Sequence, residues 1–381
     1  MNAPSPLTTP QSAAALITQV LAPIKAAFVG KEIVIDLLGL CLVAGEHCFI
    51  LGPPGTAKSA LVQALGRRLA GRTFDYLLTR FTEPNELFGP FDIRRLREGD
   101  LVTNTEGMLP EADLVFLDEL LNANSAVLNS LLMVLNERVF RRGRETRALP
   151  MLMAVGASNR LPEDETLRAL FDRFLVRVRS DNVADERLSD VLIAGWKLEN
   201  REPVADPFPI AGIRHLRQAV REVDLTAVRP IYAGIISRLR RAGIPLSDRR
   251  AVRLQGLVAA SAILCGRSVA QISDCWVLRH TWDTEEQREL LEATVGQALE
   301  QAQERADDHP QARKAGAPDA EVLAAEVTAL ESEAAGDEAA RARVRDRLSL
   351  LLCRLPWIAN STARTALQQQ TDALWARLST P

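Results

Sequence analysis

A glycine-rich turn that leads into a lysine and a serine is the first group of residues in this sequence that could carry chemistry. The stretch Phe49–Val62 reads FILGPPGTAKSALV, an apolar run followed by the turn and then by helix-forming residues. Gly52 and Gly55 let the backbone curl so that successive N–H groups point at phosphate oxygens, and the N-terminus of the following helix adds its positive dipole. We expect this P-loop to bind a nucleoside triphosphate, with Lys58 on the β- and γ-phosphates and Ser59 on a Mg²⁺ ion. The expected nucleotide contacts are Gly52, Pro53, Pro54, Gly55, Thr56, Ala57, Lys58, Ser59 and Ala60.

The residue before the lysine departs from the usual pattern of this loop, which has a glycine there. In this sequence it is Ala57. An alanine fits with little strain if the backbone is right-handed helical at that point, and we expect that conformation. The alternative is a tight turn with an incidental Lys-Ser pair. The order strand, turn, lysine, hydroxyl, helix favours the nucleotide site.

Two adjacent carboxylates supply a second group of candidates. The segment ADLVFLDEL is an apolar strand that ends in Asp118 and Glu119. Neighbouring side chains at a strand end point in different directions, so one acid can reach the Mg²⁺ shell while the next faces the γ-phosphate. We expect Asp118 to lie on the metal side and Glu119 to be the base that activates water. Such a pair alone more often marks an exposed strand end, but together with the P-loop it becomes specific.

Polar residues beside two further apolar runs extend the candidate set. Asn159 ends the run MLMAVGASN, where its amide could orient the attacking water, although an asparagine at a strand end is usually turn chemistry. Arg173 lies in ALFDRFLVRV, just before an expected strand. It could reach the γ-phosphate of a neighbouring subunit as an arginine finger, or it could form a local salt bridge with Asp172.

A pair of arginines in the later, helical part of the chain is the last candidate. In SDRRAVRL, Ser247 could cap a helix whose first turn presents Arg249 and Arg250. An arginine that faced the phosphates from there would couple the nucleotide state to the position of a lid. The spacing does not choose between the two arginines, and two solvated arginines are the alternative.

The elements that would position these residues alternate between strands and helices. Apolar β-runs separated by helices predict a parallel five-stranded sheet covered on both faces, an α/β fold. The expected strands are His47–Leu51, Thr73–Leu78, Leu114–Leu117, Met151–Ala157 and Phe174–Val178. The expected helices are Ser12–Phe28 with a kink at Pro23, Lys58–Ala70 and Ser125–Asn136.

Composition shifts predict the domain organisation. Two charged stretches, Asp92–Thr105 and Arg138–Arg147, are expected as hairpin-like insertions on the sheet, with Gly143 at the turn of the second. After about Ser180, helical patterns replace strand patterns, which predicts an all-α lid domain. The expected parts are a loose tail at 1–11, an α/β nucleotide-binding domain at 12–182, the lid at 183–283 and a helical C-terminal extension at 284–381.

The C-terminal extension is rich in Ala, Glu, Gln and Arg, as long solvent-facing helices are. Apolar residues recur at helical spacing in two stripes, which are Leu323, Val327 and Leu330, and Leu367, Leu374 and Leu378. Acidic residues and the arginine run that follows them would pair across a helical hairpin near Gly336. The acidic residues are Glu326, Glu331, Glu333, Asp337 and Glu338, and the arginines are Arg341, Arg343, Arg345 and Arg347. A solvated helical bundle is favoured over a dedicated binding surface.

Composition argues against several classes of protein. The 46 Lys and Arg residues against 49 Asp and Glu residues leave a net charge of −3, so nothing global indicates a nucleic-acid or membrane partner. The five cysteines form no CxxC pair and the four histidines no ligand spacing, which indicates free thiols in a reducing compartment and no metal cage of side chains. With no run of membrane-spanning length and no signal-peptide pattern, we expect a cytoplasmic protein.

Taken together, these segments resemble the MoxR family of AAA+ ATPases, and within it the RavA-like subgroup. The resemblance covers about Leu16–Asp283 and runs through GPPGTAKS, YLLTRFTEPNELFGP, GMLPEADLVFLDEL, LNSLLMVLNER, ASN and LFDRFLVR. Carried over by position, it implies Lys58 and Ser59 as the Walker A pair, Asp118 and Glu119 as the Walker B pair, Asn159 as sensor 1, Arg173 as the arginine finger and Arg249 as sensor 2. The alanine before the lysine is also typical of this family.

The resemblance further implies ATP and Mg²⁺ as cofactors, hexameric rings, chaperone-like remodelling of client protein complexes, and a partner with a von Willebrand factor A domain. It implies that Asp92–Thr105 is the helix-2 insert and Arg138–Arg147 the hairpin before sensor 1, which line the pore or one ring face. The C-terminal extension does not match the discoidal insertion of the RavA-like subgroup.

Two other functions remain open from the residues. The same core could work on nucleic acid as a helicase-like motor or loader, with the arginines of Arg138–Arg147 as contacts, although the acidic net charge argues against it. A non-hydrolysing scaffold is disfavoured, because a carboxylate such as Glu119 poised on water has no role in a passive site.

Overall fold

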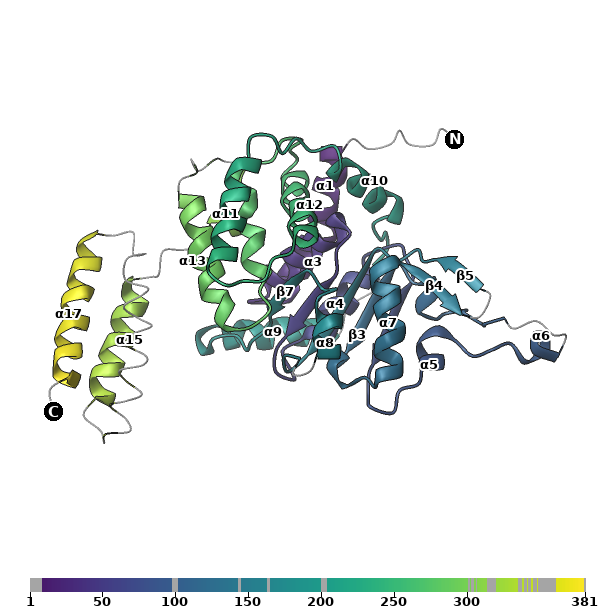
Figure 1. Ribbon diagram of the computed structural model, residues 1–381, viewed down its shortest axis with the longest axis horizontal. Helices are drawn as coiled ribbons and strands as arrows, with labels where there is room; N and C mark the ends of the chain where they lie inside the picture. The colour runs from purple at the N-terminus through teal and green to yellow at the C-terminus, as the bar shows by residue number, and fades with distance from the viewer. Residues whose placement is uncertain are drawn as a thin grey trace. The chain divides into compact units, whose positions relative to one another are not determined.

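The computed structural model describes residues 9–97, 102–142, 145–162, 165–199, 204–300, 307–313, 320–334 and 361–379, with single positions between 302 and 348 (Figure 1). Its contacts divide the chain into two compact units, Met1–Ala312 and Arg313–Pro381. Each unit has its own cluster of buried apolar side chains. In the described part of the chain, no helix is both long and apolar enough to cross a membrane.

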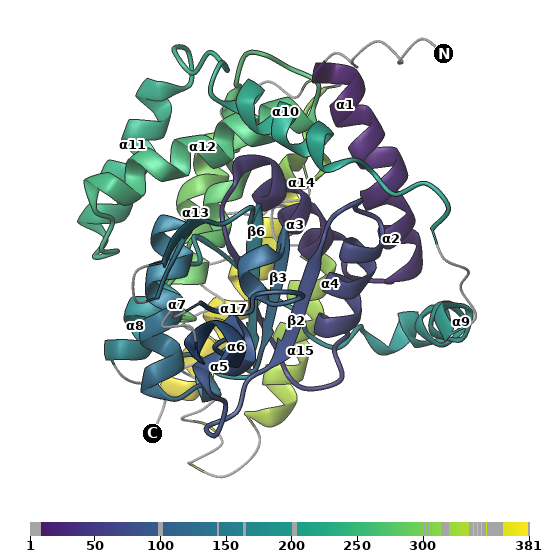
Figure 2. The same ribbon diagram turned by 90° about the vertical axis from the view of Figure 1, so that its right-hand side faces the viewer.

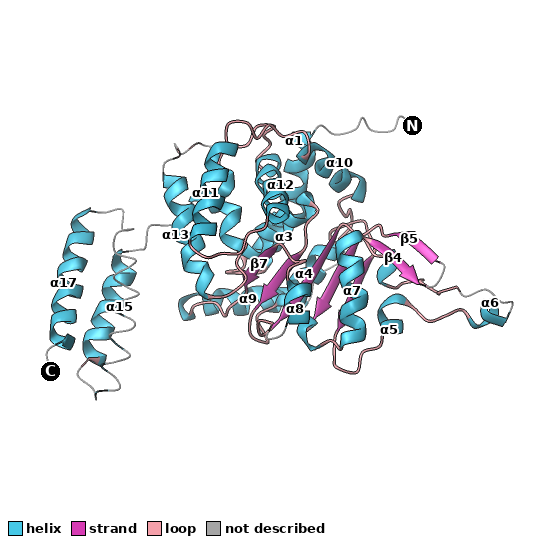
Figure 3. Ribbon diagram, viewed as in Figure 1, coloured by secondary structure: helices cyan, strands magenta, loops and turns pink. Residues whose placement is uncertain are grey.

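A parallel sheet of five strands lies at the centre of the first unit (Figure 3). The strand order is β2-β3-β6-β1-β7, with β1 at Cys48–Leu51, β2 at Thr73–Leu77, β3 at Leu114–Asp118, β6 at Met153–Ser158 and β7 at Val176–Arg179. All neighbouring strands in it are parallel, so their carboxyl ends meet at one edge. The predicted five-stranded parallel sheet is confirmed, and each strand lies close to its expected bounds.

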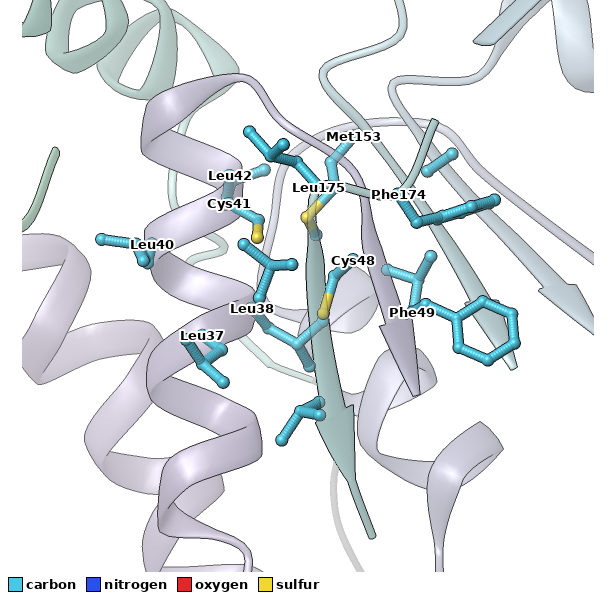
Figure 4. Close-up of a cluster of buried hydrophobic side chains, with 14 of the residues drawn as sticks. Leu37, Leu38, Leu40, Cys41, Leu42, Cys48, Phe49, Met153, Phe174 and Leu175 are labelled. Carbon is cyan, nitrogen blue, oxygen red and sulfur yellow. The ribbon is translucent and has the colours of Figure 1, made fainter. Parts of the chain in front are cut away.

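Helices cover this sheet. Two of them, α4 (Lys58–Arg67) and α7 (Ser125–Glu137), lie where the sequence predicts them, and α8 (Glu165–Phe171) precedes β7. Helix α3 (Glu32–Ala44) is buried at every position from Val34 to Val43. Figure 4 shows α3 side chains beside Cys48 and Leu175, at the start of β1 and just before β7. Sequence patterning does not predict α3 because a helix buried on all sides has no polar face to reveal its period.

The N-terminal helices differ slightly from the expected kinked helix Ser12–Phe28. Helix α1 (Thr9–Ala15) continues through a π-helical turn, η1 (Leu16–Leu21), into α2 (Ala22–Ala27), with Pro23 in the first turn of α2. A proline clashes with the carbonyl four residues earlier in a regular α-helix. The wider π turn before Pro23 accommodates that clash in place of a sharp kink.

Two insertions project from the same side of the core and contact each other through Arg142 and Gly89 (Figure 1). The first contains α5 (Pro84–Phe88) and α6 (Ile93–Arg97), and an antiparallel bridge between Phe91 and Thr103 closes its base as a hairpin-like arm. The second is the antiparallel hairpin of β4 (Val139–Arg142) and β5 (Glu145–Ala148), as predicted, although Gly143 at its expected turn lies outside the described residues. Short 3₁₀ turns, η2 (Leu109–Glu111) and η3 (Leu120–Asn122), flank β3.

The helical part of the first unit extends further than the sequence predicts. Its elements are η4 (Asp185–Arg187), α9 (Leu188–Glu199), α10 (Ile210–Val220), α11 (Arg229–Arg241), α12 (Asp248–Leu264), η5 (Ile272–His280), α13 (Glu286–Glu300) and α14 (Pro310–Arg313). Helix α13 packs on η5 and α11 and buries Leu291, Val295 and Ala298. The expected lid boundary at 283 is therefore too early, because the Ala- and Glu-rich composition of α13 conceals an apolar stripe at helical spacing.

A buried ion cluster joins the lid to the last strand. Arg177 of β7 is fully buried, with Nη1 2.7 Å from Asp283 and 2.9 Å from the carbonyl oxygen of Trp282. Arg250 of α12 contacts the same Asp283 carboxylate at 2.8 and 2.9 Å. Burial, and then the charge of Arg250, lower the pKa of Arg177 to about 9. The carboxylate thus ties two guanidinium groups from different domains together.

The second unit is described through α15 (Ala320–Glu333), α17 (Ser361–Ser379) and a few positions between them. Both predicted apolar stripes are buried in its core, which consists of Leu323, Val327, Leu330, Ala334, Val344, Leu348, Leu367, Leu374 and Leu378. The expected turn near Gly336, with most of the arginines after it, lies outside the described residues, as does Cys353.

Candidate nucleotide-binding site

The P-loop runs from the end of β1 into α4 at the edge where the strand carboxyl ends meet. The N–H of Gly52 donates to the carbonyl of Ser158 at 3.0 Å. A Cβ at Gly52 would lie 2.2 Å from the carbonyl oxygen of Ser180, so the packing of β7 leaves no room for a side chain. Gly55 has a φ of +83°, which a glycine adopts without strain. The Ser180 hydroxyl donates to the carbonyl of Thr56 at 2.9 Å and fixes the far side of the loop.

Ala57 does not have the expected right-handed conformation. Its φ is 66° and its ψ is 21°, in the left-handed region. A loop that turns successive N–H groups toward one centre just before a helix needs such a residue. The prediction for Ala57 is therefore wrong, and the alanine accepts a cost of roughly 1–2 kcal/mol that a glycine would avoid.

The lysine and the serine at the start of α4 face different parts of the site. Lys58 is 6% exposed, and its Nζ donates to the carbonyls of Gly52 at 2.7 Å and Pro53 at 2.9 Å. Ser59 Oγ donates to Asp118 Oδ2 at 2.6 Å. The structure thus brings the hydroxyl of α4 and the carboxylate of β3 together, as expected of a pair on one metal ion.

These two oxygen donors fit Mg²⁺. Mg²⁺ prefers oxygen ligands, keeps several waters, and is usually bound by one or two protein groups plus phosphate oxygens. The described residues include no cluster of three or more His, Cys, Asp or Glu side chains that could hold a metal by themselves. Ser59 and Asp118 therefore suit a Mg²⁺ ion that arrives with a nucleotide.

Glu119 follows Asp118 in a strained conformation. Its φ is 50°, which is uncommon for a residue other than glycine, and such strain often lies at functional sites. Its N–H donates to Asp118 Oδ1 at 2.9 Å, and Asn122 Nδ2 lies 3.4 Å from its carboxylate. The Asp118 carboxylate thus contacts Ser59, while the Glu119 carboxylate lies near Asn122.

Asn159 comes directly after β6, which lies between β3 and β1 in the sheet. The register pairs Leu117 with Gly156 and Leu51 with Ser158. Asn159 is therefore at the same edge as Glu119 and the P-loop, and it is exposed.

Sequence reasoning missed a lysine beside the P-loop. Lys31 is 5% exposed and its Nζ donates to the carbonyl of Asp181. Burial lowers the pKa of Lys31, the carboxylate of Asp181 opposes this, and the charge of Lys58 adds to it. Gly30, with a φ of +72°, packs against Val183. The only sequence signal for this site was that Gly30 and Lys31 come directly before an apolar run, and that run shows no helical periodicity.

Arg173 lies at the opposite edge of the sheet from the P-loop. It precedes β7, whose first residue, Val176, pairs with Cys48 at the start of β1. Arg173 lines a pocket of about 170 Å³ together with Arg138, Arg249 and Arg253, and with Gly45, Glu46, His47, Leu135 and Asn136. Its Nε is buried without a hydrogen-bond partner among the described residues. The alternative salt bridge is not found, because Asp172 instead lies 3.8 Å from Arg177 and from Arg250.

The two lid arginines differ from the expectation that one of them faces the phosphates of its own chain. Ser247 caps α12 as predicted. Arg249 is exposed and donates to Asn136 Oδ1 at 3.0 Å, inside the pocket of Arg173. Arg250 is buried against Asp283. Neither reaches the P-loop of the same chain, because the lid packs beside the amino ends of the strands.

The edge of the sheet where the strands begin, here called the amino edge, carries an excess of positive charge. Arg253 pairs with Glu46, while Arg138 and Arg217 lie nearby. Burial, and then the charge of Arg138, lower the pKa of Arg217 to about 10. His47 donates from Nε2 to the carbonyl of Leu135 and accepts the N–H of Ala154 at Nδ1, both at 3.0 Å. Burial first, and then Arg138, lower the pKa of His47 to about 3, so it stays neutral. This edge is suited to bind a polyanion from outside the chain.

Comparison with known proteins matches both domains of the first unit. A family model described as the MoxR domain in MoxR-vWA-beta-propeller ternary systems matches residues 15–218, more than half of the chain. A model of an AAA lid domain matches residues 215–295. A crystal structure from Cytophaga hutchinsonii, whose name proposes an ATPase, has a TM-score of 0.62 and 17% identity over 77% of this chain and 96% of that one. At that identity it supports the fold alone, an α/β domain with a helical lid.

Relatives in sequence are more similar. Two uncharacterised proteins of Methanocaldococcus jannaschii are 36% and 35% identical over 258 and 257 residues, which cover 67% of this chain and 67% and 68% of theirs. Chaperone MoxR1 of Mycobacterium tuberculosis is 25% identical over 173 residues, 44% of this chain and 45% of that protein.

Proposed function

Because this chain belongs to the MoxR family of AAA+ ATPases, we propose that it is a Mg²⁺-dependent ATP hydrolase whose subunits assemble head to tail into a ring. The observation that carries this proposal is the 2.6 Å contact of Ser59 with Asp118. It brings together a helix N-terminus that suits phosphate and a strand end that suits metal, and a separate base follows at Glu119.

The edge where the strand carboxyl ends meet is here called the carboxyl edge. Each of its candidate residues then has a role in hydrolysis. Bound Mg²⁺ would supply charge neutralisation of the β- and γ-phosphates. Lys58 and the P-loop N–H groups bind the phosphates, and Ser59 and Asp118 hold the metal. Glu119 accepts a proton from the attacking water, and Asn159 orients that water.

The arginines of the amino edge act on the neighbouring subunit. An arginine that reaches a γ-phosphate in trans stabilises the charge of the transition state. Arg173 has this role, and Arg249, in the same pocket, supports it. A subunit by itself therefore binds ATP and hydrolyses it slowly.

We further propose a chaperone-like remodelling role on a client protein, with a partner that carries a von Willebrand factor A domain. The matched family model is named for systems that contain such a domain, and one relative is named a chaperone. Membership of the RavA-like subgroup, a hexameric ring and a cytoplasmic location are predictions from the sequence. The insertions of α6 and of β4–β5 would meet the client or the partner.

A role on nucleic acid finds less support in the hairpin. Arg141 pairs with Glu137 at 2.8 Å. Arg142 donates to the carbonyl of Gly89 and stacks 3.9 Å from the centre of the Phe91 ring. These described arginines fix the hairpin to its own chain, so they are poor candidates for phosphate contacts.

Turnover per subunit against protein concentration tests the proposal. We expect it to rise as the ring forms, and Glu119→Gln to slow it by about 10²- to 10⁴-fold while ATP stays bound. Glu222→Gln, an exposed residue of the lid, is the matched control and should match the parent. Turnover that is flat with concentration, or a Glu119→Gln variant as fast as the control, would contradict the proposal.

A further inference from the structure

Helix α9 presents two apolar faces, and its own chain covers one of them. Val191, Ala194 and Leu198, at helical spacing, are partly buried, and α9 contacts α2 on this side. The opposite face carries Leu188, Leu192, Ile193 and Trp196, which are 50%, 66%, 55% and 74% exposed. A helix that is apolar on both sides is typical of a buried helix. A contiguous exposed apolar patch in turn marks an interaction surface.

This helix is held to the nucleotide edge of the core. It begins at Leu188, eight residues after Ser180, which contacts the P-loop, and Val183 between them packs on Gly30. Arg187, in the turn before α9, lies 3.6 Å from Glu32 of α3. Figure 2 shows α9 projecting from the flank of the core opposite α7 and α8. The exposed face is therefore beside the P-loop and not beside the arginine pocket.

The charges around α9 select among classes of partner. Three acidic residues, Asp185, Glu186 and Asp190, are exposed at and before its first turn. They outnumber the two exposed basic residues, Arg187, which lies 3.6 Å from Glu32, and Lys197 in the last turn. Helices that bind membrane surfaces carry Lys and Arg around the apolar face, so an acidic rim disfavours anionic lipid. It favours a partner surface with excess positive charge.

The opposite end of the same chain has such a surface. Arg173 and Arg249 line the pocket there, and two exposed apolar side chains flank it. Met133, 45% exposed, lies on α7 three residues before Asn136, and Val252, 65% exposed, lies on α12 three residues after Arg249. One end is thus apolar with an acidic rim, and the other is apolar with arginines.

We propose that the outer face of α9 docks on a second copy of this chain, on the surface that carries Met133, Val252 and the arginine pocket. This inference rests on the proposed head-to-tail ring and adds to it the apolar contact that holds the P-loop of one subunit against Arg173 of the next. Aromatic residues such as Trp196 often contribute most of the affinity at such contacts.

Sedimentation tests the contact directly. In the Glu119→Gln background with ATP and Mg²⁺, Trp196→Asp should raise the protein concentration needed for assembly by about tenfold or more. Lys197→Asp places the same carboxylate on the adjacent exposed position and should assemble like the parent. Leu192→Ser is a second variant of the same face. Unchanged binding of a fluorescent ATP analogue to each variant would show that it is folded.

Mixing variants tests which side of the contact α9 supplies. Trp196→Asp keeps an intact arginine end, and Arg173→Ala keeps an intact P-loop and α9. Turnover of the mixture should exceed the sum of the two separate samples several-fold, because one interface type is then complete. A Trp196→Asp variant that assembles like the parent, or a mixture that recovers nothing, would overturn the inference. Parent turnover that is flat with concentration would instead defeat the proposed ring itself.

Discussion

The carboxyl edge and the amino edge of the central sheet carry different kinds of functional residue. At the carboxyl edge, Gly52 follows β1, β3 ends in Asp118 and β6 ends in Ser158, and Asp118 contacts Ser59 of α4. At the amino edge the residues that precede the strands lie among arginines, with Arg173 and Arg249 in one pocket. A strand of four residues separates the edges by roughly 13 Å, so no side chain spans them. In the proposed ring, these are two complementary half-sites, and a second chain completes each of them.

The largest expected effects are on turnover for a variant of the amino edge and on ATP binding for a variant of the carboxyl edge. Arg173→Ala should lower turnover by about 10³-fold, about 4 kcal/mol in the barrier, because it removes charge stabilisation in trans. Binding of ATP to the dilute chain should be unchanged. Lys58→Ala should instead abolish that binding, as measured by titration with a fluorescent analogue. Equal losses of ATP affinity in both variants would contradict the division between the edges.

The adjacent lid arginines sharpen the comparison. Arg250→Ala removes one of the two arginines that pair with Asp283, the other being Arg177. It should lower the unfolding free energy by about 3 kcal/mol. Arg249→Ala removes an exposed side chain, so stability should stay within about 0.5 kcal/mol while turnover falls about tenfold. Urea unfolding and ATPase assays on both variants check this. A stable Arg250→Ala with slow turnover would reverse the roles.

Acid should weaken the amino edge through His47. Its pKa is about 3 in the folded chain against 6.5 in the unfolded chain, since burial excludes the proton. The unfolded state therefore binds the proton first, so stability is complete above pH 6.5 and is lost as the pH falls toward 3. At pH 5 the loss from this group is about 2 kcal/mol.

Urea unfolding at pH 7.5 and pH 5 measures this loss. His47→Gln should show a smaller drop between the two pH values than the parent. His215→Gln, at an exposed position, is the control and should keep the full drop. Equal drops in all three proteins would exclude His47 as the sensitive group.

The smallest expected effect concerns the carboxyl edge. Ala57→Gly relieves a left-handed alanine and should raise the unfolding free energy by up to about 1 kcal/mol, partly offset by the greater freedom of glycine in the unfolded chain. Thermal unfolding measures it. A destabilised variant would mean that the methyl group of Ala57 makes packing contacts worth more than the strain.

Local sequence patterns predicted the carboxyl edge better than the amino edge. The P-loop, Asp118 and Glu119 follow from residue types placed directly after apolar strands, and neighbouring strand ends meet wherever the sheet is parallel. The backbone of Ala57 was predicted wrongly, since the loop requires a left-handed residue whichever side chain is present. Local pattern therefore fixes which residues meet at this edge but not every backbone angle.

The amino edge depends on how the lid packs, which no local pattern encodes. Arg249 and Arg250 are adjacent in sequence, yet one is exposed beside Arg173 and the other is buried against Asp283. Arg177 alternates with valines as if it were on a solvent face, but the lid covers it completely. Tertiary placement of α12 and η5 decides these outcomes.

A chain with two unlike ends has polarity, as the monomer of a filament has. Head-to-tail contacts close into a circle only when the turn between neighbours divides a full rotation evenly, and otherwise they continue as a helix. A subunit whose α9 surface is disrupted can still bind to an assembly through its arginine end, and it then blocks the addition of further subunits. Small amounts of a variant such as Trp196→Asp would therefore inhibit assembly of the parent protein when the two are mixed.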